Sequence, residues 1–393
     1  MEHCCVVGAG IGGLNTVRAL RAQGYGGRIT LVGAEPYLPY DRPPLSKQLL
    51  RGEVDDTTLP ADWPAWDVDV RLGARATGLR DGVVETDAGE IGCDGLVLAT
   101  GAVPVRLPGP GPQRTLRTVD DARALRAVLK PGVRLAIVGA GWIGAEIATA
   151  ARAAGCEVTV VEAGPAPLAA ALPRDVARLM AAWWREAGVE LLLDAPAASV
   201  ETGGLVLAGG ETVPADEVLT AVGVRPASRG LDAVRLRADG AVLVDEHLSA
   251  GDGRCAVGDV AAAWSPRYGR YLRVEHWDNA LRAPAVAAAT LLGADAAYDP
   301  VPYVWSEQFG RYLQFVGLRQ DGDELVWRGD PDADPTWSAC WVRDGRLRAL
   351  LAVGRPRDAV QGRRLAERGV PVDVAALTDP AVPLKRAALE VAD

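Results

Sequence analysis

Two glycine-rich turns, each followed by an acidic residue, carry the strongest chemical signal of the sequence. The first turn contains Gly8, Gly10 and Gly13, and Glu35 follows 22 residues after the last of them. In such a turn the first glycine permits a tight bend, the second lets backbone amides approach a pyrophosphate, and the third lets a helix pack closely on a strand. A carboxylate at the position of Glu35 accepts hydrogen bonds from ribose hydroxyls. These residues predict a dinucleotide-binding site.

The second turn repeats the pattern with Gly139, Gly141 and Gly144, and Glu162 follows 18 residues after Gly144. One glycine motif is weak evidence, because 45 of the 393 residues are glycine. Two complete motifs are strong evidence for two dinucleotide sites. Glu162 favours NADH over NADPH, because a carboxylate repels a 2′-phosphate and accepts hydrogen bonds from a free 2′-hydroxyl.

The segments around each turn have the order strand, turn, helix and strand. We expect strands at 4–7 and 28–32 around the first helix, and at 135–138 and 157–161 around the second. Later strands at 96–101, 218–223 and 255–261 return to these units and end in glycine turns. The candidate residues in these returning segments are Thr100, Gly101, Gly223, Gly258 and Asp259.

The sequence therefore predicts an α/β fold with two Rossmann-like nucleotide-binding domains, the second inserted in the first, and a small α+β C-terminal domain. The expected boundaries are 1–108 with 229–304 for the first domain, 109–228 for the second and 305–393 for the third. A proline-rich stretch at 104–112 marks the first crossover.

Composition limits the classes of partner. With 42 basic and 51 acidic residues the net charge is −9, which disfavours nucleic acid as a partner. No apolar run approaches the roughly 20 residues that span a bilayer, and the N-terminus lacks the features of a signal peptide. We expect a cytoplasmic protein without a membrane span.

The six cysteines do not have the spacing of a redox-active dithiol, which argues against a disulfide reductase mechanism. The adjacent pair Cys4 and Cys5 is better explained as small apolar residues of a first strand than as reactive thiols. We assign no metal site.

The segment Pro39–Lys47, with the sequence PYDRPPLSK, follows Glu35 and resembles a signature of the ferredoxin and rubredoxin reductases that supply oxygenases with electrons. These enzymes belong to the FAD-dependent pyridine nucleotide-disulphide oxidoreductases. Blocks at 99–101, 256–260, 274–277 and 304–309, and the tail at 369–385, are similar to later family blocks in the same order. Glu307 stands where the family often has Asp.

The resemblance implies that the first site holds FAD, with Arg42 in its signature segment, and that the second binds NADH. It implies that Lys47 lies beside the flavin ring and pairs with Glu146, where an ammonium stabilises negative charge on the reduced ring. Asp259 is similar to an aspartate that binds the ribityl chain. Trp277 and Trp305 are similar to aromatics near the flavin and nicotinamide.

Each of these roles has a simpler alternative. The alternative for Lys47 is a surface lysine without a role in the site. The alternative for Asp259 is a helix cap, and the alternative for the two tryptophans is packing in the core. His276 fits a proton role or a purely structural one.

The implied reaction passes hydride from NADH to FAD, and then single electrons to an iron–sulfur ferredoxin that serves a monooxygenase or a ring-hydroxylating dioxygenase. Residues 343–368 contain eight arginines and three acidic residues, a local charge of +5 that could steer an acidic ferredoxin. The alternative for this segment is a solvated face. Alternative activities are an NADH oxidase or quinone reductase, and a redox-responsive flavoprotein that resembles apoptosis-inducing factor.

Overall fold

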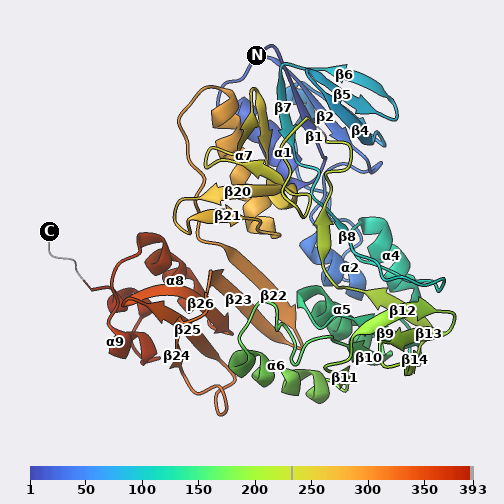
Figure 1. Cartoon of the computed structure of the whole chain (residues 1–393), viewed down its shortest axis with the longest axis vertical. Helices are drawn as coiled ribbons and strands as arrows, with labels where there is room; N and C mark the ends of the chain where they lie inside the picture. The colour runs from blue at the N-terminus through green and yellow to red at the C-terminus, as the bar shows by residue number, and fades with distance from the viewer. Residues whose placement is uncertain (232, 390–393) are drawn as a thin grey trace. The chain divides into compact units, whose positions relative to one another are not determined.

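The computed structural model describes residues 1–231 and 233–389 (Figure 1). The chain forms two compact units. The first comprises Met1–Pro43, Asp56–Val103 and Val224–Pro300, and the second comprises Pro44–Asp55, Pro104–Gly223 and Val301–Asp393. The two glycine-rich turns thus lie in different units. The division into three domains stays a prediction, because the second unit combines the second nucleotide-binding segment with the C-terminal segment.

The first unit is built on a six-stranded sheet. Its order is β18 (Ser249–Gly251), β19 (Arg254–Ala256), β7 (Gly95–Leu98), β1 (His3–Val7), β2 (Arg28–Gly33) and β3 (Val68–Leu72). All neighbouring strands run parallel except β18 and β19. Strand β1 is buried along its whole length, as expected for a parallel sheet that is covered on both faces. Val7 pairs with both Val32 and Leu98, so three strands end together where the first glycine turn begins.

Helix α1 (Ile11–Ala22) follows this turn, and α7 (Trp277–Leu291) packs beside it (Figure 1). Val17 and Leu20 of α1 and Ala283 and Ala287 of α7 belong to the same buried cluster as the sheet. The segment that returns after residue 255 therefore covers the helix of the first glycine turn.

Smaller elements complete the first unit. The antiparallel meander is β4 (Ala76–Arg80), β5 (Val83–Thr86) and β6 (Gly89–Gly92), and a second small sheet is β17 (Val242–Val244), β20 (Ala261–Ser265) and β21 (Arg270–Leu272). The short elements are α3 (Trp63–Trp66) and η2 (Gly258–Val260). Strand β8 (Ala102–Pro104) pairs with β16 (Val224–Pro226) where the chain leaves and re-enters this unit.

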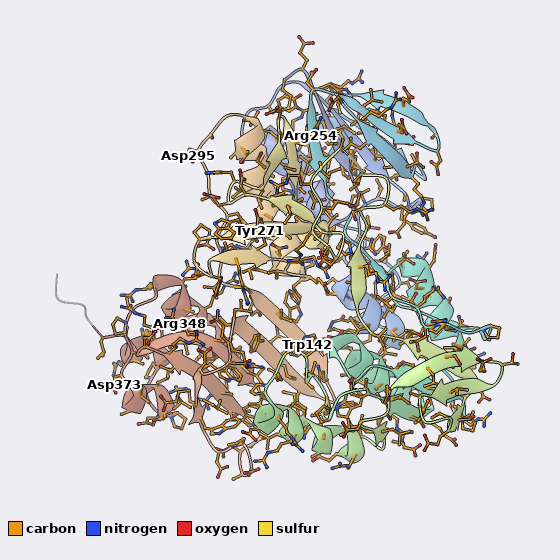
Figure 2. The ribbon with its side chains drawn as sticks, viewed as in Figure 1. Trp142, Arg254, Tyr271, Asp295, Arg348 and Asp373 are labelled. Atoms are coloured by element: carbon orange, nitrogen blue, oxygen red, sulfur yellow. The ribbon has the colours of Figure 1, made fainter. Side chains whose placement is uncertain are left out.

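The second unit contains a four-stranded parallel sheet. Its order is β11 (Glu190–Leu192), β10 (Glu157–Val161), β9 (Arg134–Val138) and β15 (Glu217–Thr220). Helix α5 (Trp142–Ala153) follows β9, and its first residue Trp142 is labelled in Figure 2. The other elements around this sheet are η1 (Pro43–Ser46), α2 (Gln48–Arg51), α4 (Val119–Val128), β12 (Ala197–Glu201), β13 (Gly204–Leu207) and β14 (Thr212–Pro214).

The C-terminal part of the second unit is a five-stranded antiparallel sheet. Its order is β22 (Tyr303–Gln308), β23 (Arg311–Gly317), β26 (Arg346–Val353), β25 (Trp337–Arg343) and β24 (Glu324–Arg328). On one face Met180 and Trp183 of α6 (Arg174–Glu186) pack with Trp337 and Trp341. On the other face Leu365 of α8 (Pro356–Arg368) packs in a cluster that also includes residues of α9 (Val374–Thr378) and η3 (Leu384–Ala387). Apolar side chains on both faces explain why this sheet and the second nucleotide-binding segment form one unit.

The structure divides the arginine-rich stretch at 343–368 into two different elements. Residues 346–353 form β26, which lies in the interior of the sheet, and residues 356–368 form α8. The local charge of +5 at 343–368 does not show whether these side chains share one surface, and the structure places them on two different elements. None of the helices in the described parts of the chain is long and apolar enough to cross a membrane.

Candidate functional site

The first glycine turn requires glycine at two of its positions. Gly8 has a φ of +117°, and a Cβ atom there would lie 2.1 Å from the carbonyl oxygen of Ala99. A Cβ at Gly13 would lie 1.9 Å from the carbonyl oxygen of Gly8. Gly10 differs, because it caps α1 and a Cβ there would meet no atom within 4 Å. The turn is therefore tight on its protein side and open at Gly10.

The second glycine turn has the same construction. Gly139 has a φ of +102°, and a Cβ there would lie 2.6 Å from the carbonyl oxygen of Ala221. A Cβ at Gly144 would lie 2.0 Å from the carbonyl oxygen of Gly139, whereas one at Gly141 would meet nothing within 4 Å. Gly141 caps α5, as Gly10 caps α1, and neither helix start has a side-chain cap. Both helix N-termini therefore present backbone amides in the manner of a pyrophosphate site.

Glu35 lies at the end of β2 in the first unit and is held by two side chains. Its Oε1 accepts a hydrogen bond from Arg42 Nη2 at 2.8 Å, and its Oε2 accepts one from the Tyr40 hydroxyl at 2.5 Å. The Arg42 guanidinium also lies over the Tyr40 ring, 5.2 Å from its centroid. Arg42, which was predicted to bind FAD, thus forms an ion pair with Glu35, which was predicted to bind a ribose.

Glu162 lies at the end of β10 in the second unit and is held by the backbone. Its Oε2 accepts from the amide of Ala140 and its Oε1 from the amide of Gly164, both at 2.8 Å. Ala140 belongs to the second glycine turn, so Glu162 braces this turn directly. Each carboxylate oxygen keeps a second lone pair for a ribose hydroxyl.

The other predicted residues of the first unit lie on its returning segments. Thr100 and Gly101 follow β7, and the Thr100 hydroxyl is buried without a hydrogen-bond partner among the described residues. Asp259 lies in η2, where Gly258 has a φ of +72° and the Asp259 carbonyl accepts from Arg273 at 3.4 Å. A buried orphan hydroxyl beside an open glycine turn fits a bound ligand, so these residues are compatible with FAD.

Trp277 and His276 begin α7. The indole nitrogen of Trp277 donates to Asp41 Oδ1 at 2.6 Å, which links α7 to the signature segment at 39–47. The backbone of His276 caps the helix, and its carbonyl accepts from the amide of Asn279 at 3.1 Å. These backbone contacts define the helix start, and the role of the His276 side chain stays a prediction.

Lys47 and Glu146 meet in the interior of the second unit. Lys47 Nζ lies 2.7 Å from Glu146 Oε2, and the two side chains are 10% and 4% exposed. Lys47, one of only three lysines in the chain, is therefore not a surface lysine.

Gly223 lies in the same unit. It follows β15 and has a φ of +102°.

Two serines of this site were missed by the sequence analysis. The hydroxyls of Ser46 and Ser306 donate to the carboxylate of Glu146 at 2.5 and 2.6 Å. The sequence holds no signal for Ser306, because its burial and that of Gln308 follow from the place of β22 in its sheet. Trp305 stacks on Tyr303 at a centroid distance of 5.8 Å.

None of the six cysteines forms a disulfide, although a hydrogen bond from Cys5 lowers the pKa of the half-buried Cys93 thiol. Cys4 and Cys5 are both fully buried. Burial raises the pKa of the Cys4, Cys255 and Cys340 thiols to about 12, so they stay protonated near neutral pH. The positions of these thiols agree with the structural interpretation of Cys4 and Cys5.

Two family models cover most of the chain. Residues 2–283 match the pyridine nucleotide-disulphide oxidoreductases, and residues 303–388 match a reductase C-terminal family. A similar curated relative is the anthranilate 1,2-dioxygenase system ferredoxin--NAD(+) reductase component of Burkholderia cepacia, which is 38% identical over 97% of this chain and 98% of its own. Putidaredoxin reductase CamA of Pseudomonas putida is 31% identical over 98% of this chain and 96% of its own.

Solved structures agree with these matches. The crystal structure of Fdr9 has a TM-score of 0.93 and 49% identity, with 98% of this chain and 99% of that chain covered. Putidaredoxin reductase in its covalent complex with putidaredoxin has a TM-score of 0.93 and 30% identity, with 98% of each chain covered. The predicted fold class and the predicted family are confirmed, and FAD and NAD(H) agree with this family. The chain belongs to the pyridine nucleotide-disulphide oxidoreductase family, in its ferredoxin reductase branch.

Proposed function

We propose that the chain is an NADH-dependent ferredoxin reductase that takes electrons from NADH and passes them singly, through FAD, to an iron–sulfur ferredoxin of an oxygenase system. The observation that supports this function is the combination of two complete dinucleotide turns with the absence of a redox dithiol. Two turns fit two dinucleotides, and without a dithiol the electrons need an external acceptor. The acceptor behind the ferredoxin is a monooxygenase or a ring-hydroxylating dioxygenase, and the protein works in the cytoplasm.

The first unit would hold FAD. Gly8, Gly10 and Gly13 give the pyrophosphate its place at the start of α1, and Glu35 binds the adenosine ribose with its remaining lone pairs. Residues of the signature segment, of the returning segments and of α7 would contact the rest of the cofactor. These are Arg42, Thr100, Gly101, Gly258, Asp259 and Trp277.

The second unit would bind NADH. Gly139, Gly141 and Gly144 accept the pyrophosphate at the start of α5, Gly223 lies at the neighbouring strand end, and Glu162 selects against a 2′-phosphate. The flavin supplies the step from two-electron to one-electron chemistry. Lys47, held by Glu146, would supply a fixed positive charge for the reduced ring, and by the family resemblance Trp305 would contact the flavin or the nicotinamide.

The ferredoxin would dock on α8 rather than on the whole stretch at 343–368. Arg357, Arg364 and Arg368 are exposed and recur at seven and four residues, which places them on one face of the helix. None of the three makes an ion pair with another described residue. Lys385 of η3 lies beside them, since its amide donates to Gln361 Oε1 at 2.9 Å. These four cations border a groove with the apolar Val360 and Leu365, and the groove complements an acidic ferredoxin.

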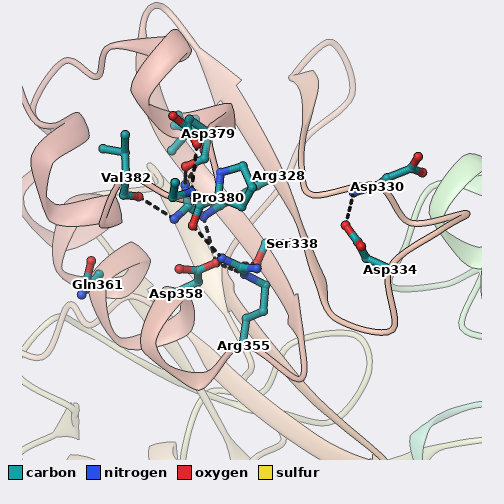
Figure 3. A network of polar contacts seen from close by, with 12 residues as sticks. Arg328, Asp330, Asp334, Ser338, Arg355, Asp358, Gln361, Asp379, Pro380 and Val382 are labelled. Atoms are coloured by element: carbon teal, nitrogen blue, oxygen red, sulfur yellow. Dashed lines mark hydrogen bonds and ion pairs between the residues drawn. The ribbon is translucent and has the colours of Figure 1, made fainter.

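The other arginines of the stretch have hydrogen-bond or ion-pair partners in the C-terminal part of the second unit. They are Arg343 with Asp323, Arg346 with the carbonyl of Gly369, Arg348 with Asp344, Arg355 with Asp358, and Arg363 with Glu367. Figure 3 shows that Asp358 also accepts from Arg328 and Ser338, at 2.9 and 3.1 Å. Arg355 is thus part of a buried network, and docking is assigned to Arg357 and Arg364 instead.

The proposed function is tested by mixing the purified yellow protein with NADH under anaerobic conditions. NADH should bleach the flavin rapidly, and cytochrome c should then be reduced only when a ferredoxin such as putidaredoxin is added. Rapid peroxide formation in air without ferredoxin would instead indicate an oxidase. Very slow bleaching with a long-lived charge-transfer band would indicate a redox-responsive binding protein.

The docking assignment is tested with the double variant R357E/R364E. Reversal of two groove charges should raise the KM for putidaredoxin about tenfold at low salt and flatten its dependence on salt, because exposed charge pairs are screened by salt. Bleaching by NADH should be unchanged. The control is R80E, which reverses the charge of an exposed residue on β4 in the other unit. A wild-type salt dependence in R357E/R364E would rule out this groove as the docking site.

A further inference from the structure

The carboxylate of Glu146 receives hydrogen bonds from two separate segments of the second unit. Lys47 and Ser46 come from the segment before α2, and Ser306 comes from β22, which is 160 residues further along the chain than Glu146. Glu146 is 4% exposed, Ser46 is 4% exposed and Ser306 is fully buried. Solvent therefore contributes little to the geometry of this cluster.

The two carboxylate oxygens of Glu146 have different partners. Oε2 accepts from Lys47 Nζ at 2.7 Å and from Ser46 Oγ at 2.5 Å, on the side of the ion pair. Oε1 accepts from Ser306 Oγ at 2.6 Å. Ser306 is thus the donor that fixes the oxygen opposite the ammonium.

A fixed point at Oε1 matters because the last torsion of a glutamate side chain is soft and has no sharp minimum. Helix α5 places the base of the side chain, but it does not set the plane of the carboxylate. With Oε1 bound to Ser306, the plane is set and Oε2 must face Lys47. A buried ion pair also depends on hydrogen bonds to the rest of the carboxylate, since the burial of both charges is otherwise costly.

Ser306 is itself held in place. It lies in the middle of β22, where it pairs with Leu313 of β23, and its hydroxyl accepts from Gln308 Nε2 at 3.1 Å. Strand alternation sends Glu307 to the other face, where its side chain is 41% exposed and lies 3.9 Å from Arg51. Ser306, which Gln308 contacts, therefore contributes to the Glu146 cluster, whereas Glu307 does not.

We propose that Ser306 is a positioning residue for the redox site: its hydroxyl orients Glu146, and Glu146 in turn holds the Lys47 ammonium, which would stabilise the reduced flavin. The C-terminal sheet thereby contributes to the geometry of the Lys47–Glu146 ion pair. This inference rests on the proposed function, because it assumes that Lys47 serves a flavin.

The test compares S306V with S306T, two variants of nearly the same shape of which only the second keeps a hydroxyl. In S306V the rate constant for flavin bleaching at saturating NADH should fall about tenfold, the apparent Kd for NADH should change less than twofold, and the flavin midpoint potential should become more negative. S306T should recover at least half of the rate and the wild-type potential. K47A removes the ammonium itself, so its changes in bleaching rate and midpoint potential are the largest that S306V can cause.

A matched control is S338A, which removes another fully buried serine of the same sheet that donates to a carboxylate, in this case Asp358. It should leave both readouts unchanged. The midpoint potential is measured by reduction against redox dyes, without NADH, so it tests Ser306 even if the wild-type protein does not react with NADH and the proposed function fails. If S306V folds with the wild-type potential and rate, or if S338A shifts them equally, the proposal is wrong. If S306V does not fold, S306A is measured against S306T by the same criteria.

Discussion

The two glycine-rich turns share their backbone geometry and differ in what covers them. Gly8 and Gly139 both have φ angles near +110°, and the next glycine of each turn caps a helix beside open space. The turns diverge two residues later, where the first has Gly12 and the second has Ile143. The turns also differ at the preceding position, which is Ile11 in the first and Trp142 in the second, but the change in burial lies at Gly12 and Ile143.

Gly12 is buried because another segment of the first unit packs against it. A Cβ built at Gly12 lies 3.6 Å from Val257 Cγ2 and 3.9 Å from the carbonyl oxygen of Ala280 in α7. Ile143 in α5, in contrast, is 43% exposed. A covered turn suits a cofactor that stays bound, and an exposed turn suits one that exchanges, as the proposed roles of FAD and NADH require.

The acidic residues that follow the two turns, Glu35 and Glu162, also differ in their contacts. Glu35 is bound by the side chains of Tyr40 and Arg42, so a segment outside the glycine turn depends on it. Glu162 is bound by the amides of Ala140 and Gly164, so it supports its own turn. The acidic residue of the first unit is thus held by side chains, whereas that of the second is held by backbone amides.

The largest test of this comparison is to place valine at the second glycine of each turn. Gly10 and Gly141 have φ angles of −94° and −80°, which any residue adopts, and a Cβ at either meets no protein atom within 4 Å. The valine would therefore enter the space of the pyrophosphate. G10V should yield a protein without flavin, whereas G141V should keep its flavin and lose bleaching by NADH at least a hundredfold.

Flavin content is measured from the ratio of visible to ultraviolet absorbance, and bleaching by stopped flow. Circular dichroism checks that both variants fold, since the loss of a good cap costs only about 1 kcal/mol. The assignment of cofactors to units would be refuted if G141V lost its flavin or if G10V retained it.

A smaller effect is expected at the acidic residues. E162R should narrow the preference for NADH over NADPH about tenfold, as judged by kcat/KM for each, because it replaces a charge that repels the 2′-phosphate with one that attracts it. The kcat/KM for NADH should also fall, since Glu162 no longer supports Ala140. E35Q is the counterpart in the first unit and should weaken flavin retention without a change in the preference. If the ratio of kcat/KM for NADH to kcat/KM for NADPH were the same in E162R and wild type, the proposed role of Glu162 would be contradicted.

The sequence predicted both turns because all their requirements are local. A tight bend, a helix start and a strand end lie within a short stretch, so glycine spacing and apolar runs are enough to find them. The contact between Glu146 and Ser306 joins residues 160 positions apart. Spacing alone holds no information about such a pair, and only the register of β22 in its sheet reveals it.

The C-terminal segment shows a second limit. Arg346 and Arg348 alternate with Leu347 and Ala349, which is the pattern of a strand with one buried face. The local charge of +5 does not show which arginines share a surface, and the alternation at 346–349 was not used. Some of the arginine partners are local, as Asp358 is for Arg355, and others are distant in sequence, as Asp323 is for Arg343.

The smallest expected effect concerns the covered and exposed positions themselves. G12I would force a large side chain between Ala99, Val257 and α7, and such overpacking costs about 1 to 3 kcal/mol in the free energy of unfolding. I143G removes a half-exposed side chain from α5 and should cost only about 1 kcal/mol, mainly from helix propensity. The midpoint of thermal unfolding, measured with the same excess of FAD, should therefore fall further for G12I. G12A is the control, because a Cβ there makes ordinary contacts and should leave the midpoint unchanged or slightly higher. Equal losses in G12I and I143G would mean that the covering segment does not distinguish the two turns.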